Sequence, residues 1–121
     1  MWAGGGYYNA QGVTSNLLEH WDGTEWSVVP SPSPGVTQNI LQGLSSNGPT
    51  DAWAVGYMSS DPFAVPSTMA LHWNGSRWST TRSVNVGQES IFAAVAVDHA
   101  SGVWAVGEHG PGVKPLIEHD C

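Results

Sequence analysis

Positive charge is scarce in this sequence of 121 residues, which has three Lys and Arg residues, ten Asp and Glu residues and a net charge of −7. The three cations are Arg77, Arg82 and Lys114, and they form no cluster. Nucleic-acid binding depends on cations that displace counterions from phosphates, so we expect no nucleic-acid partner. Adsorption to an anionic membrane surface is disfavoured for the same reason.

Cysteine and long apolar runs are also scarce. The one cysteine is Cys121, so no disulfide can form within the chain. The apolar runs are only a handful of residues long, which predicts no insertion into a membrane. No basic-then-apolar leader is present, and Met1 is followed at once by a repeat motif, so we expect the start to be a truncation of something longer.

Glycine and tryptophan are abundant, with fifteen Gly and seven Trp. Charged residues make up only 11% of the chain, far below the roughly 25% of an average domain. Glycine and proline recur too often for helices, and no stretch holds a helical period of 3.6 residues. Many turns with few charged faces indicate an all-β protein.

A repeat with a period of about 51 residues organises the sequence. A Trp-Ala-x-Gly motif begins at Trp2, Trp53 and Trp104. A His-Trp-Asp/Asn-Gly-x-x-Trp-Ser motif begins at His20 and again at His72, 52 residues later. Apolar runs at 40–45 and 91–96 form a third repeating unit. Recurrence of rare residues at one period is poorly explained by chance.

Each repeat predicts four short antiparallel strands. The apolar run comes first, the Trp-Ala-x-Gly segment second, and the two Trp-containing segments of the longer motif third and fourth. Asp22-Gly23 and Asn74-Gly75 separate the last two, and such dipeptides favour a tight hairpin because both residues tolerate a positive φ. A four-stranded unit of about 50 residues is typical of a β-propeller blade.

These motifs resemble bacterial repeat proteins whose blades read W-A-V-G and then H-W-N-G-x-x-W-S. The resemblance extends more distantly to kelch blades, through Gly4-Gly5 and the paired tryptophans, although Gly56 and Gly107 each stand alone. It implies a β-propeller segment from a secreted or cell-surface bacterial protein, acting as a binding or structural module. The alternative that it leaves open is a fragment of a galactose-oxidase-like or glycosidase propeller with its catalytic residues elsewhere.

The chain holds about two and a half blades: a partial one over 1–35, a complete one over 36–86 and a partial one over 87–121. That arrangement predicts ten strands, and one copy cannot close a ring of four to eight blades. Its open edges favour association, so self-association that completes a propeller is one expectation, and a fragment of a longer protein is the other.

Loop length varies mainly at one end of the predicted blades. The distance from the Trp of Trp-Ala-x-Gly to the following His is 18, 19 and 15 residues, while the last hairpin has a constant length. Variable loops on a rigid scaffold often bind ligands, so aromatic residues here could contact a glycan or a protein. They also suit a structural role as blade caps. The residues in or near these loops are Tyr7, Tyr8, Tyr57, Met58, Phe63, Glu108 and His109.

Other prominent residues favour structural roles. The strict period of Trp53 and Trp104, and of Trp26 and Trp78, predicts that these rings fill the space between blades. The repeating His20, His72 and His119 would lie on separate blades, so we expect hydrogen-bonded structural residues and no metal site. No nucleophile elbow or phosphate-binding loop is present, and we predict neither a cofactor nor enzymatic activity.

Overall fold

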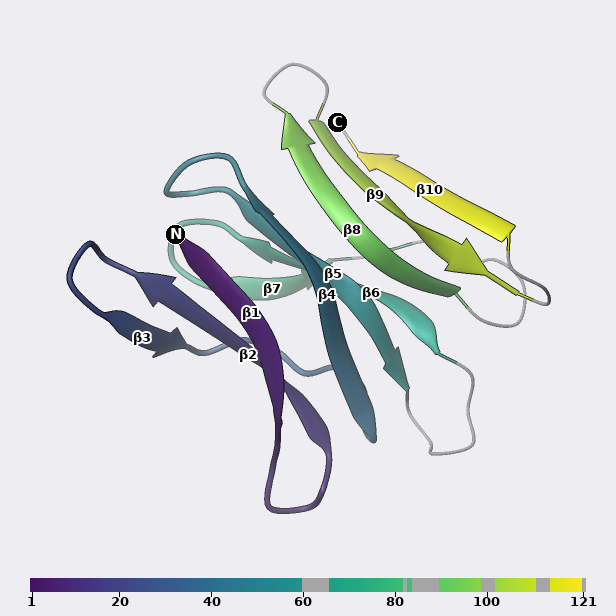
Figure 1. Cartoon of the computed structure of the whole chain (residues 1–121), viewed down its shortest axis with the longest axis horizontal. Coiled ribbons are helices and arrows are strands. Elements are labelled where there is room, and N and C mark those ends of the chain that lie inside the picture. Colours follow the sequence, from purple (N-terminus) through teal and green to yellow (C-terminus); the bar gives the residue numbers. More distant parts are fainter. Residues whose placement is uncertain (60–65, 82, 84–89, 99–101, 111–113, 121) are drawn as a thin grey trace.

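The computed structural model describes residues 1–59, 66–81, 83, 90–98, 102–110 and 114–120. These residues form ten strands in three antiparallel sheets and no helix, as the sequence predicts (Figure 1). The first sheet has the order β1-β2-β3, the middle sheet β4-β5-β6-β7 and the last sheet β10-β9-β8. The strands are β1 (Trp2–Tyr8), β2 (Thr14–Trp21), β3 (Trp26–Val29), β4 (Gln38–Ser46), β5 (Ala52–Ser59), β6 (Ser67–Trp73), β7 (Trp78–Thr81), β8 (Ser90–Asp98), β9 (Gly102–His109) and β10 (Lys114–Asp120).

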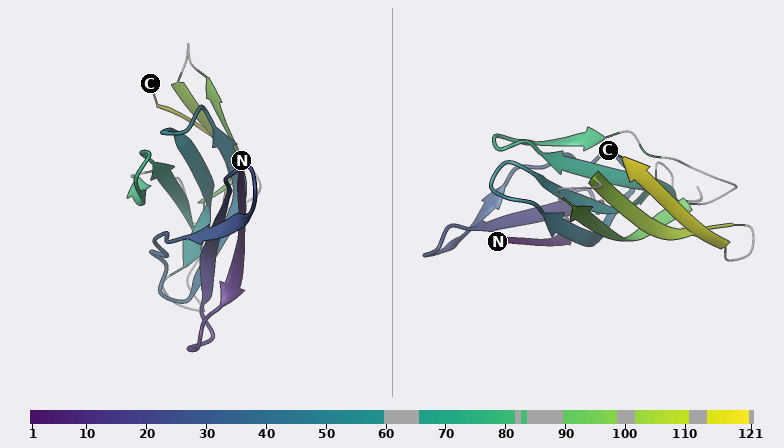
Figure 2. Two further views of the ribbon diagram at one scale, coloured as in Figure 1. Left: turned by 90° about the vertical axis from the view of Figure 1, so that its left-hand side faces the viewer. Right: turned by 90° about the horizontal axis from the view of Figure 1, so that it is seen from above.

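The three sheets follow one another across the molecule in chain order (Figures 1 and 2). Successive residues of a strand point to opposite sides, so each sheet has two faces. We call the side that carries the Trp of Trp-Ala-x-Gly the leading face, and the side that carries the Ala of that motif the trailing face. The strand registers place the equivalent residues of all three repeats on equivalent faces.

The leading faces of the first and middle sheets each pack on the trailing face of the sheet that follows. Trp2 and Leu18, from the first sheet, join Ala54, Leu71 and Trp78 of the middle sheet in one apolar cluster. A second cluster repeats this arrangement between the middle and last sheets. It contains Val55, Ala70, Phe92, Ala105 and Leu116. The core therefore consists of two layers, each sandwiched between neighbouring sheets.

Tryptophan fills the first of these layers. The ring of Trp2 lies 5.0 Å from that of Trp73 and 5.0 Å from that of Trp78, both in edge-on geometry. Trp78 is only 4% exposed, which confirms that this repeat position fills the space between sheets. The same prediction is wrong for Trp26 and Trp104, which are 43% and 41% exposed. They lie on the two outer faces of the stack, where no described sheet covers them.

The glycine of Trp-Ala-x-Gly is required by a neighbouring strand. Gly56 lies opposite Leu41, where a bulge shifts the register of β4, and a Cβ at Gly56 would overlap the carbonyl oxygen of Ile40. Gly107 has the same relation to the bulge in β8. Gly5 is different, because β1 is an edge strand and no other atom lies within 4 Å of a Cβ built there. Glycine is thus needed where the Trp-Ala-x-Gly strand has the bulged strand of its repeat beside it, as β5 has β4 and β9 has β8. The first sheet has no such strand beside β1.

We expect Gly56→Ala to destabilise the protein by about 3 kcal/mol, since the added methyl group forces the bulge apart. The matched variant Gly5→Ala should change the free energy of unfolding by less than about 0.5 kcal/mol, because space is open there. Urea unfolding followed by tryptophan fluorescence measures both. Equal losses in the two variants would show that the close approach at the bulge is not the reason for glycine.

Replacing tryptophan by alanine should destabilise the protein more at the buried copy of this repeat position than at the exposed copy. Trp78→Ala leaves a cavity against Trp2 and is expected to cost about 3–5 kcal/mol, whereas Trp26→Ala should cost no more than about 1 kcal/mol. Thermal unfolding at a low protein concentration checks this difference. If Trp26→Ala proved as costly as Trp78→Ala, the exposure of Trp26 in the free chain would be refuted.

Candidate functional site

The loops sort to two ends of the molecule, as the strand order predicts. At one end, the indole Nε1 of Trp73 donates to the Pro49 carbonyl at 3.1 Å, joining the first and third hairpins of the middle sheet. At the other end, the backbone N–H of Asn39, near the start of β4, donates to Thr14 Oγ1 at 3.1 Å, which joins the hairpin between β1 and β2 to the middle sheet. This second end carries the loops of variable length.

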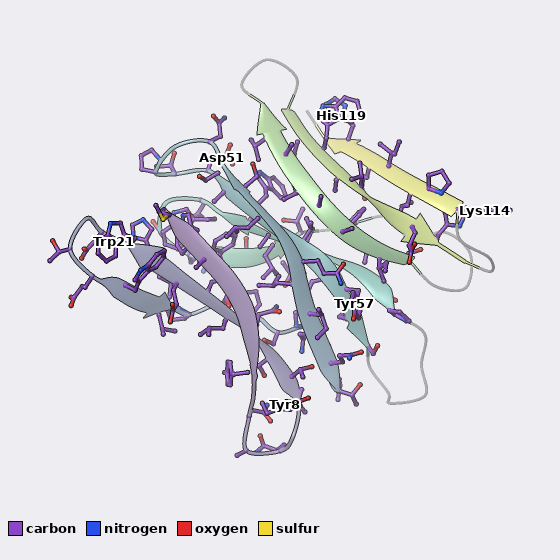
Figure 3. The ribbon with its side chains drawn as sticks, viewed as in Figure 1. Tyr8, Trp21, Asp51, Tyr57, Lys114 and His119 are labelled. Carbon is purple, nitrogen blue, oxygen red and sulfur yellow. The ribbon has the colours of Figure 1, made fainter. Side chains whose placement is uncertain are left out.

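A hollow at the variable-loop end lies between the first and middle sheets. It holds about 270 Å³, and Tyr8, which is 77% exposed, stands at its border near the tip of β1 (Figure 3). The glycines of β1 leave this space open because they carry no side chain. The lining residues are Gly5, Gly6, Tyr7, Tyr8, Thr14, Asn39, Ile40 and Leu41.

A buried amide fixes the wall of this hollow. Asn39 is fully buried, and its Nδ2 donates to the carbonyls of Thr14 at 3.0 Å and Gly35 at 2.9 Å. Its Oδ1 accepts from the Gly35 N–H. Because every polar atom of this side chain has a partner, it holds β2, β4 and the connection between them in one arrangement.

Asn39 was not among the residues predicted from the sequence. One signal could have revealed it: the equivalent position of the next repeat is Ser90, which is also polar and also buried. A polar residue that recurs immediately before an apolar strand indicates a buried hydrogen-bonded position in that repeat.

Only two of the predicted ligand-binding residues come together. Tyr7 and Tyr8 share the hollow. Tyr57 is half-buried on the leading face of the middle sheet and lies apart from Tyr8 in Figure 3. Glu108 is on the leading face of the last sheet and His109 on its trailing face. Met58 packs against the first core cluster, and Phe63 lies outside the described residues.

The repeating histidines have structural partners. Each ring lies against the Trp ring opposite it in the register, with centroid distances of 4.7 Å for His20 and Trp2, 4.4 Å for His72 and Trp53, and 4.0 Å for His119 and Trp104. The last pair is stacked, and the other two are tilted. In addition, His72 Nε2 lies 2.8 Å from Asp51 Oδ1. Within the described ranges, no three His, Cys, Asp or Glu residues gather as metal ligands would.

The hairpins at the opposite end form as predicted, although by a different turn. Asp22 accepts from the N–H groups of Thr24 at 2.8 Å and Glu25 at 2.9 Å, and Asn74 makes the same pair of bonds in its repeat. Only the glycine of each dipeptide has a positive φ. The Asp or Asn side chain therefore closes a four-residue loop in place of a two-residue turn with two positive φ values.

These N–H donors lower the pKa of the exposed Asp22 carboxyl below its ordinary value, with the Glu25 bond contributing most. A lowered pKa in the folded state stabilises the protein above the pKa of the unfolded chain, and this contribution is lost as the pH falls through the folded pKa.

Asp22→Asn should keep the turn, as Asn74 does, and remove this pH dependence. We expect the Tm of the wild type to fall more than that of Asp22→Asn between pH 6 and pH 3. Differential scanning calorimetry measures the difference, with Asp22→Ala as the control that loses the turn at both pH values. Parallel curves for wild type and Asp22→Asn would contradict the effect.

A scan against protein-family models finds no match for this chain, and searches of curated proteins and solved structures find none either. The described part of the chain also contains no helix long and apolar enough to span a membrane. Inference about function therefore draws on the sequence and the geometry of this molecule.

Proposed function

We propose that this chain is a non-enzymatic binding and structural module of β-propeller type, in which the three sheets act as blades. The support is the recurrent packing of leading face on trailing face, together with the similar Trp-Ala-x-Gly strands and bulges of the repeats. We further propose that the module is extracellular or at the cell surface, in keeping with its sequence resemblance and few Lys residues.

The hollow beside Tyr7 and Tyr8 is the proposed ligand site. An exposed aromatic ring next to open space offers an apolar surface for the face of a sugar ring, and the hydroxyl of the half-buried Thr14 supplies a polar group in the same lining. Tyr8 is the single observation that carries this proposal, because so large an apolar ring is left in water at the border of the hollow. A glycan is the ligand class that we favour.

A glycan array probed with the labelled protein tests this site. We expect binding to a restricted set of glycans, and a loss of about tenfold in affinity for Tyr8→Ala, because a ring contact is worth about 1.4 kcal/mol. Val36→Ala is the matched control, since Val36 is an exposed apolar residue outside the lining of the hollow.

Two outcomes would overturn the glycan site. One is a wild-type protein that binds no glycan, in which case a protein ligand becomes the better candidate for the module. The other is binding that Tyr8→Ala and Val36→Ala leave equally intact, which would place the glycan elsewhere on the molecule.

A further inference from the structure

We propose that the two outer faces of the stack bind each other between copies of this chain, with the leading face of the last sheet on the trailing face of the first sheet of a second copy. In this contact, Trp104 of one copy enters between Trp21 and Trp26 of the other. The inference is independent of the glycan site.

The leading face of the last sheet is exposed at positions that are buried in the middle sheet or, for the Trp of Trp-Ala-x-Gly, half-buried there. Trp104, Val106 and Ile117 are 41%, 41% and 64% exposed. The residues equivalent to Val106 and Ile117 in the middle sheet are Val55 and Ala70, which are 1% and 6% exposed. The sheet that follows along the chain buries them. Trp104, Val106 and Ile117 therefore form an exposed apolar stripe, which is typical of a surface that binds another protein surface.

The trailing face of the first sheet shows the complementary pattern. Met1 and Trp26 are 74% and 43% exposed, and their equivalents in the middle sheet, Ala52 and Trp78, are 0% and 4% exposed. Here the preceding sheet provides the cover. Trp21 and His119 lie at opposite ends of the molecule, so the two exposed faces cannot meet within one copy (Figure 3).

In the free chain, the pair Trp21 and Trp26 already has the geometry of the equivalent pair that binds a tryptophan between the first and middle sheets. The rings of Trp21 and Trp26 lie 5.6 Å apart at an interplanar angle of 48°. The buried pair Trp73 and Trp78 lies 5.9 Å apart at 45°. This second pair receives Trp2, the repeat equivalent of Trp104, at 5.0 Å from each ring. A preformed aromatic notch costs little side-chain entropy on binding.

The internal contact between sheets also identifies the occupant as a second copy. The molecule contains both halves of one interface, and it shows them joined between its first and middle sheets. An unrelated partner would have to reproduce a Trp-bearing strand with small and branched residues at alternate positions. A second copy presents that strand without any change in conformation.

The predicted contact is heterologous, because two different surfaces meet. It is also smaller than the internal one. The middle sheet contributes β4 beside β5, whereas the first sheet has β1 at its edge. We therefore expect reversible association, with a Kd on the order of 10–100 µM.

Sedimentation velocity over a wide range of concentrations tests the proposal. The wild type should shift from monomer to larger species, and Trp104→Glu and Trp26→Glu should each weaken association at least about 30-fold, as loss of a central tryptophan does. Ile117→Lys is a second variant on a surface position, so it tests the leading face without depending on how Trp104 substitutions fold. Tyr8→Ser is the control, because Tyr8 is even more exposed, at 77%, but lies on the leading face of the first sheet, outside both faces of the predicted contact.

A mixing experiment distinguishes this contact from any symmetric one. Trp104→Glu keeps an intact trailing face and Trp26→Glu keeps an intact leading face. The equimolar mixture should therefore form a 1:1 dimer and nothing larger, although each variant alone stays monomeric. Near-UV circular dichroism confirms that both variants are folded.

Three results would overturn the proposal. The wild type could remain monomeric at 1 mM, about tenfold above the weakest Kd expected, which would assign the exposed faces to a different partner. Association could persist in Trp104→Glu and in Ile117→Lys, which would place the contact elsewhere. Finally, the folded variants could fail to form a dimer when mixed, which would exclude the head-to-tail arrangement.

Discussion

Packing between sheets is the constraint on which this structure depends, because the faces at which neighbouring sheets meet are apolar. Trp2 and Leu18 on the leading face of the first sheet leave water by packing on the trailing face of the middle sheet. A single repeat unit cannot bury its own apolar face, and stacking on a neighbouring unit buries it. Stability therefore arises from the neighbours, and the strand positions repeat because the contacts repeat.

The other devices of the fold serve that stacking. Gly56 and Gly107 let β5 and β9 approach bulged strands closely, and Gly43 lets β4 approach the backbone of β8, where a Cβ would lie 2.8 Å from the Ala94 Cα. Asn39 ties the first sheet to the start of the middle one by hydrogen bonds at their shared end. The Trp–His ring contacts join neighbouring strands within each sheet, since each pairs directly opposed residues.

Much of this architecture was predictable from the sequence, because the repeat spaces its strands regularly. The strand order within each sheet, the number of strands and the sorting of loops to two ends all follow from the positions of Trp53, His72 and Trp78 within one period. The exposure of Trp26 and Trp104 could not be predicted, because the repeat period gives the position of a residue but not whether a neighbouring sheet covers it.

The candidate site was predicted less well than the fold. Tyr7 and Tyr8 line one hollow, but the other described candidates, Tyr57, Glu108 and His109, are dispersed. The sequence shows that a residue is in a variable loop, but not on which face of the sheet its side chain lies.

The linear order of the three sheets has a consequence for how the protein opens. Among the described residues, both apolar clusters join sheets that are adjacent in the chain, as in a one-dimensional array with nearest-neighbour coupling. The middle sheet takes part in both couplings and each terminal sheet in one, so amide hydrogens of β5 and β6 would exchange only through global opening, while either terminal sheet can detach alone. Joining copies end to end would convert terminal sheets into internal ones, and the assembly would gain cooperativity without any change in the individual sheet.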